Sequence, residues 1–132
     1  MSLQTWKEEF YPTEAGSPEA QASPIEHSLI KWKGLTKENL DKHAVKKTEG
    51  YIWIGDDNNS LCIDSDSCSL CLKARSIRSL KQSSLMCEEC EIHKNLNEEC
   101  DIEYATWCRT GDPTTMISLL TRTLDASKTS TP

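Results

Sequence analysis

The sequence predicts a small α+β domain whose short helices and single β-hairpin are organised around a zinc knuckle of four cysteines. Two C-x2-C pairs lie fifteen residues apart in the middle of the chain, a spacing typical of structural zinc sites. A β-branched and aromatic run precedes a turn-rich segment at residues 55–60, as in a hairpin. Apolar residues recur at helical spacing on both sides of this region, which predicts short helices.

Residues 1–24 are predicted to form an irregular segment that packs onto the body of the domain. The second half of this segment is rich in small residues, proline and glycine, which favour turns. We expect a single zinc-containing domain over residues 25–125 and a disordered tail over residues 126–132. Three aromatic side chains near the start of the chain are expected to be buried against the body: Trp6, Phe10 and Tyr11.

Capping residues indicate where the helices begin. Ser23 precedes a proline and stands three residues before a glutamate, which is a helix N-terminal signature. Gly34 stands where a C-terminal glycine cap is expected, and Thr36 can cap a second short helix. Asp112 and the proline after it predict a third helix, with an apolar stripe through residues 116–124. The stripe of the first helix consists of Ile25, Leu29 and Trp32.

The predicted hairpin joins residues 51–54 to residues 61–63 and leads into the cysteine region. Its turn contains an Asp-Asp-Asn-Asn cluster at residues 56–59. Such a cluster can ligate a hard cation, but the rest of a calcium-binding loop is missing. The sequence therefore favours a turn over a calcium site.

The cysteine pairs predict a structural zinc site with Cys68, Cys71, Cys87 and Cys90 as ligands. Two residues between thiols let one tight turn direct both sulfurs at a single ion, and two such turns complete a tetrahedron at about 2.3 Å. Four thiolates leave no open coordination position, so the zinc would be structural rather than catalytic.

Other readings of the cysteines stay open at this point. Cys100 or His93 can replace one of the four ligands, since His93 follows Cys90 by three residues. The cysteines can also be plain buried thiols, as we expect for Cys62 and Cys108, because free cysteine behaves as a small hydrophobe. Redox use of a C-x2-C pair is a further alternative, although such pairs normally lie within a βαβ unit, which the sequence does not predict.

The cysteine count and the hydropathy pattern predict a cytoplasmic protein. Seven is an odd number of cysteines, and the first residues lack the apolar stretch of a secretory signal. Metal ligation is therefore a better interpretation than a disulfide framework. No run of about 18 apolar residues is present, so no membrane span is expected.

Charge distribution bears on nucleic-acid binding. The formal net charge is −6, which argues against general attraction to phosphate backbones. A basic stretch lies between the cysteine pairs, but residues 87–104 carry seven acidic residues against one lysine. Nucleic-acid binding is thus an alternative rather than the main hypothesis. Its candidate residues are Lys73, Arg75, Arg78 and Lys81.

The motif survey favours binding over catalysis. The sequence contains no G-x-S-x-G, Walker loop, H-E-x-x-H or dinucleotide fingerprint. An enzyme with Cys62, Cys100 or Cys108 as nucleophile would need a nearby base and a lowered thiol pKa, neither of which the sequence shows. We therefore expect a zinc-containing adaptor that contacts a protein partner, with a nucleic-acid-binding zinc module as the alternative.

The chain resembles small, uncharacterised cysteine-rich proteins of bacteriophages and prophages over most of residues 6–124. This resemblance implies a phage-related origin and a cytoplasmic setting in the infected or lysogenic cell, without an established activity or functional residues. In such proteins the second cysteine pair is followed by Pro-Leu, where this chain has Glu91 and Ile92. The stretches that carry the resemblance are 6–12 (WKEEFYP), 27–35 (HSLIKWKGL), 38–40 (ENL) with His43, the paired cysteines, and 111–113 (GDP) with Met116 and Ile117.

Overall fold

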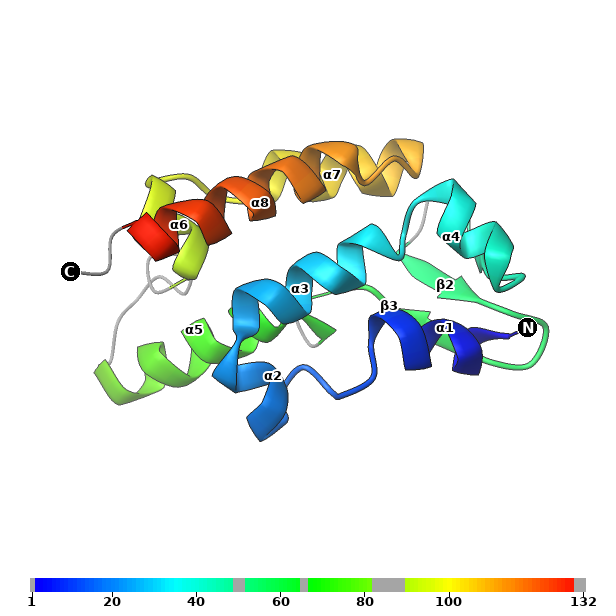
Figure 1. The fold of residues 1–132 in the computed structure, drawn as a ribbon, viewed down its shortest axis with the longest axis horizontal. Coiled ribbons are helices and arrows are strands. Elements are labelled where there is room, and N and C mark those ends of the chain that lie inside the picture. Colours follow the sequence, from blue (N-terminus) through cyan, green and yellow to red (C-terminus); the bar gives the residue numbers. More distant parts are fainter. Residues whose placement is uncertain (1, 49–51, 65–66, 82–89, 130–132) are drawn as a thin grey trace.

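The computed structural model describes residues 2–48, 52–64, 67–81 and 90–129. Helix α3 (Pro24–Lys33) runs through the middle of the fold (Figure 1). Helix α8 (Thr114–Thr129) packs on one side of it and α5 (Ser69–Lys81) on the other. Helices α6 (Glu91–Leu96) and α7 (Asp101–Thr110) both pack on α8. Because α3 contacts α5 on one side and α8 on the other, it joins these two helical layers.

A small antiparallel sheet lies beside helices α1 and α4 in Figure 1. The strand order is β1 (Lys46–Lys47), β2 (Trp53–Gly55) and β3 (Ser60–Cys62). The β2–β3 pair confirms the predicted hairpin, whereas β1 was missed because two residues carry no periodic signal. The turn between β2 and β3 is closed by Asp56, whose Oδ1 accepts hydrogen bonds from the N–H groups of Asn58 (2.9 Å) and Asn59 (2.8 Å). The predicted turn at residues 56–59 is thus confirmed.

The N-terminal segment differs from the prediction. Residues expected to be irregular form α1 (Leu3–Phe10) and α2 (Pro18–Ala22). The side chains of Ser2 and Thr5 form a reciprocal capping box, which stabilises a helix start. The buried residues of this segment include Leu3, Trp6, Phe10 and Tyr11. At the other end of the chain, α8 reaches Thr129, so most of the expected tail is helical.

Gly34 is the C-cap of α3, but it does not form the left-handed cap that is typical of a C-terminal glycine. Its φ of −68° is right-handed and suits any residue. The ring of Phe10 instead lies so close that a Cβ on Gly34 would come within 2.4 Å of the Phe10 Cγ. The Gly34 carbonyl also accepts a hydrogen bond of 2.8 Å from the Trp6 indole. Glycine is therefore needed here for close packing of α1 on α3.

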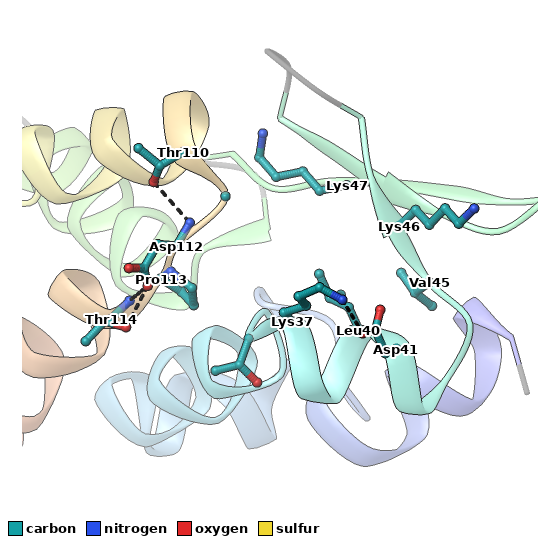
Figure 2. A pocket seen from close by; sticks show the side chains of 12 residues that line it. Lys37, Leu40, Asp41, Val45, Lys46, Lys47, Thr110, Asp112, Pro113 and Thr114 are labelled. Carbon is teal, nitrogen blue, oxygen red and sulfur yellow. Dashed lines mark hydrogen bonds and ion pairs between the residues drawn. The ribbon is translucent and has the colours of Figure 1, made fainter.

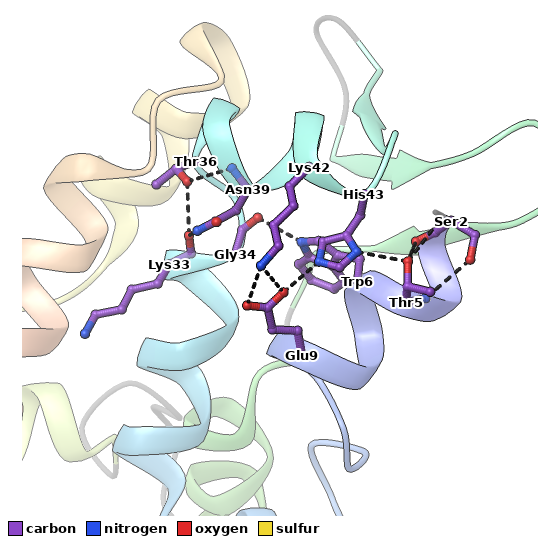
Figure 3. A network of polar contacts seen from close by, with 10 residues as sticks. All are labelled: Ser2, Thr5, Trp6, Glu9, Lys33, Gly34, Thr36, Asn39, Lys42 and His43. Carbon is purple, nitrogen blue, oxygen red and sulfur yellow. Dashed lines mark hydrogen bonds and ion pairs between the residues drawn. The ribbon is translucent and has the colours of Figure 1, made fainter.

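A polar network joins α1 to α4 (Lys37–Lys42), as Figure 3 shows. The His43 ring is buried, with its Nδ1 2.9 Å from Thr5 Oγ1 and its Nε2 2.7 Å from Glu9 Oε1. Lys42 also pairs with Glu9, at 3.1 Å. The arrangement contains a hydroxyl, an imidazole and a carboxylate, but the Thr5 hydroxyl is engaged with the backbone of Ser2. We therefore interpret the network as a structural connection.

Aromatic rings fill the core on the other side of α3. Trp32 and Trp107 meet edge to face with centroids 5.2 Å apart, and Tyr104 lies 6.0 Å from Trp107. Such pairs stabilise a core beyond the area they bury. In the described part of the chain, no helix is long and apolar enough to cross a membrane.

Candidate metal centre

Backbone anchors on both sides position Cys68 at the start of α5. Ser67 Oγ accepts a hydrogen bond of 3.1 Å from the Asp64 N–H, which closes the preceding loop. The Ser69 hydroxyl donates to the Pro24 carbonyl at 2.7 Å, and the buried Lys31 ammonium donates to the Ser67 carbonyl at 2.8 Å. These contacts hold the loop against α3, so the position of Cys68 is set by the core.

The first C-x2-C pair forms one compact unit. The Cys71 N–H donates to the Cys68 sulfur at 3.4 Å, across the first turn of the helix. A hydrogen bond from Cys71 is also the main cause that holds the pKa of the Cys68 thiol well below its ordinary value, with the Lys31 charge adding to it. The same hydrogen bond raises the pKa of Cys71, together with burial and the charges of Cys68, Cys100 and Cys90. The two thiols of this turn therefore have pKa values that are shifted in opposite directions.

Two further cysteines stand at helix starts near this unit. Cys90 is the N-cap of α6 and Cys100 is the N-cap of α7, and neither side chain caps its own helix. The Lys73–Glu91 ion pair, at 2.7 Å, ties the start of α6 to α5. The start of a helix favours negative charge nearby.

Two cavities gather these cysteines into one cluster. A cavity of about 280 Å³ is lined by Cys68, Cys71 and Cys100, together with Lys31. A second one of about 20 Å³ is lined by Cys71, Cys90 and Cys100. Since Cys71 and Cys100 line both cavities, four cysteines from three helix starts border one region. We call Cys68, Cys71, Cys90 and Cys100 the thiol cluster.

The donor chemistry of the thiol cluster suits a soft or borderline metal ion. Thiolates are the usual ligands of structural zinc, and the four cysteines of the thiol cluster can supply a complete set of four. Among the residues described here, no three Cys, His, Asp or Glu side chains stand in an arrangement ready to hold an ion. Cys87, one of the four predicted ligands, lies outside the described residues. The zinc knuckle thus stays a prediction.

The remaining candidate ligands are placed as follows. His93 lies on α6 but lines neither of the two cysteine cavities, and within the described structure its buried Nδ1 has no hydrogen-bond partner. Cys62 donates to Asp64 Oδ2 at 3.2 Å. Cys108 contributes to the raised pKa of Tyr104, which is due first to burial. Neither Cys62 nor Cys108 lines the two cavities.

The basic stretch proposed for nucleic acid is only partly described. Lys73 is tied to Glu91 and is not a free surface cation. Arg75 is half-buried. The side chains of Arg78 and Lys81 lie outside the described residues. The part that can be followed therefore does not show an open basic strip.

A separate groove lies between α4, β1 and the α7–α8 corner (Figure 2). Its volume is about 630 Å³. Leu40, Val45 and Pro113 give it apolar surface, and Lys46 and Lys47 stand on the β1 side. Its other polar and charged lining residues are Thr36, Lys37, Asp41, Thr110, Asp112 and Thr114.

Sequence reasoning missed two features of these sites. The groove was not predictable, because its walls are far apart in the sequence and β1 gave no signal. Lys31 could have been found, because it follows Ser28 by three residues and precedes Leu35 by four, on the face of α3 that is buried. A lysine at that spacing indicates either the end of a helix or a buried charged side chain with a functional role.

Comparisons of the chain with protein-family models, with curated proteins and with solved structures find no match.

Proposed function

We propose that this chain is a protein-binding domain stabilised by one structural zinc ion. The observation that carries the proposal is the convergence of four thiols on two cavities that share Cys71 and Cys100. A closed tetrathiolate site has no open position for substrate, so this site would serve stability and leave function to a surface.

We propose Cys68, Cys71, Cys90 and Cys100 as the ligands. All four belong to the thiol cluster, and the charges of the other three raise the pKa of Cys71. This set differs from the sequence-based one by placing Cys100 where Cys87 was expected. Zinc binding would draw protons from the thiols and order the three helix starts, since ligand deprotonation and folding are coupled to metal binding.

Serine substitutions test the ligand set. Each of the four variants Cys68→Ser, Cys71→Ser, Cys90→Ser and Cys100→Ser should lose stoichiometric zinc and show a lower melting temperature. Cys62→Ser and Cys108→Ser are the matched controls and should retain zinc. If Cys87→Ser loses zinc while Cys100→Ser keeps it, the sequence-based set is right and ours is wrong by one ligand.

The binding surface is proposed to be the groove between α4 and the α7–α8 corner. Its carboxylates are both engaged: Asp41 pairs with Lys37 at 2.6 Å, and Asp112 accepts hydrogen bonds from Thr114. Within the described residues, no carboxylate pairs with Lys46 or Lys47. The Lys47 ammonium bonds a backbone carbonyl, that of Cys108, at 2.9 Å. An acidic segment with apolar side chains complements this combination of charge and apolar surface.

Peptide selection tests the groove. Reduced, zinc-loaded protein should select peptides enriched in Asp and Glu from a random displayed library. Lys46→Glu should weaken the affinity for the selected peptides by about tenfold or more, as expected when a favourable contact becomes repulsive. Lys33→Glu, an exposed lysine away from the groove, should not. Peptides without acidic enrichment, or equal effects of the two variants, would reject the groove as the binding surface.

The phage-related origin and the cytoplasmic setting stay predictions of the sequence resemblance. Nucleic-acid binding stays the alternative function, and the Lys73–Glu91 ion pair weighs against it, because it removes one of the four candidate cations.

A further inference from the structure

Lys31 is the one lysine or arginine that is buried among the residues the structure describes. Its side chain is 1% exposed, and its ammonium reaches the Ser67 carbonyl at 2.8 Å. The Trp32 ring lies 5.7 Å from the same nitrogen and offers a cation–π contact. No carboxylate of the described residues forms an ion pair with it. A buried ammonium without a paired anion is strongly disfavoured, so a negative group is expected nearby.

The thiol cluster is in the right place to supply that negative charge. Lys31 lines the 280 Å³ cavity together with Cys68, Cys71 and Cys100. Its hydrogen bond to Ser67 also reaches the residue directly before Cys68. The charges of Cys68, Cys71, Asp64 and Cys100 act on the Lys31 ammonium and oppose the effect of its burial. Three of these four groups belong to the cluster.

We propose that Lys31 is the counter-cation of the metal–thiolate centre and that it increases the affinity of the cluster for zinc. This inference rests on the proposed zinc site. A zinc ion with four thiolates has a net charge of about −2, which is costly to hold where the cysteines are partly buried. The Lys31 ammonium offsets part of that charge from the α3 side, and the centre in turn supplies negative charge to an ammonium that has no ion pair with a carboxylate of the described residues. Lys31 therefore acts as a positioning residue through charge, without binding the metal.

Substitutions at Lys31 separate charge from packing. Methionine has nearly the length of lysine without the charge, whereas arginine keeps the charge and is larger. The reduced full-length chain is titrated with Co²⁺, which reports thiolate ligation by its charge-transfer absorption, and Zn²⁺ is then used to displace the cobalt. Lys31→Met should weaken zinc binding by about 10- to 100-fold, the usual loss when an outer partner of a metal site is removed. Lys31→Arg should recover most of that loss.

The control is Lys33→Met, which removes an exposed charge from the same helix and should leave the affinity unchanged. If Lys31→Met does not fold, Lys31→Gln replaces it as the neutral variant and should show the same loss. Wild-type affinity in the neutral variant, or a larger loss in Lys31→Arg than in Lys31→Met, would show that only packing matters and would overturn the inference. If the wild-type chain binds neither cobalt nor zinc, the proposed zinc site itself fails, and the inference fails with it.

Discussion

The α1–α4 region and the thiol cluster satisfy their buried polar groups in different ways. Near α1, the buried His43 has a partner on each ring nitrogen, and the Trp6 indole donates to the Gly34 carbonyl. At the thiol cluster, the buried Lys31 ammonium has one carbonyl and no carboxylate among the described residues. The first region pairs these groups with protein partners, whereas for the second we propose that a zinc ion held by the thiolates completes the site.

Metal removal should produce the largest effect and should act on one region only. Apparent binding free energies of structural zinc are on the order of 10 kcal/mol, comparable to the whole stability of a small domain. We expect a chelator to abolish amide protection in α5, α6 and α7, while α1 retains measurable protection. Hydrogen exchange with mass spectrometry resolves the two regions. Equal loss in α1 would mean that the two regions do not differ as described.

A substitution in the α1 region should lower stability without changing the zinc content. Trp6 is fully buried, so Trp6→Ala leaves a large cavity and should lower the free energy of unfolding by about 3–5 kcal/mol. Zinc content per folded molecule should not change, because Trp6 lines neither cysteine cavity. Denaturant unfolding combined with elemental analysis checks both parts. A proportional loss of zinc would contradict the separation of the two regions.

A smaller loss is expected where α1 meets the end of α3. Gly34→Ala places a methyl group against the Phe10 ring, and overpacking of this kind typically costs about 1–3 kcal/mol. A double variant, Gly34→Ala with Phe10→Leu, should recover part of the stability, since it removes the ring that causes the clash. An unchanged melting temperature in Gly34→Ala would show that the contact yields easily.

The smallest effect concerns acid. The N–H groups of Leu3, Asn58 and Asn59 hold the pKa of Asp56 below its ordinary value, with Leu3 the main cause. A lowered pKa in the folded state means that Asp56 stabilises the fold above the ordinary aspartate pKa of about 3.9, and that this contribution is lost as pH falls through the folded-state value. Asp56→Asn should therefore flatten the decline of stability below about pH 4. An unchanged acid slope would exclude this role.

The sequence predicted those features that depend on local signals. The α3 start at Pro24, the Thr36 cap and the β2–β3 hairpin follow from residues close together in the chain. The helix α1 was missed because its capping box uses a threonine rather than the expected Glu or Gln at the third position. From the sequence, Cys100 was only an alternative ligand. Helix α6 and the loop after it separate Cys100 from Cys68 in the chain, and the spacing of the cysteines does not predict how that segment folds. The burial of Lys31 could be read from its place on the buried face of α3, but its hydrogen bond to Ser67, far along the chain, could not be predicted.

The zinc content of freshly purified, reduced protein tests the central claim most directly. Elemental analysis against an amino-acid-based protein concentration should give one zinc per chain. The ratio should fall to background in Cys71→Ser, whose thiol lines both cysteine cavities, and remain at one in Cys62→Ser. Wild-type protein that is folded and reduced but carries no stoichiometric zinc or iron would contradict the account.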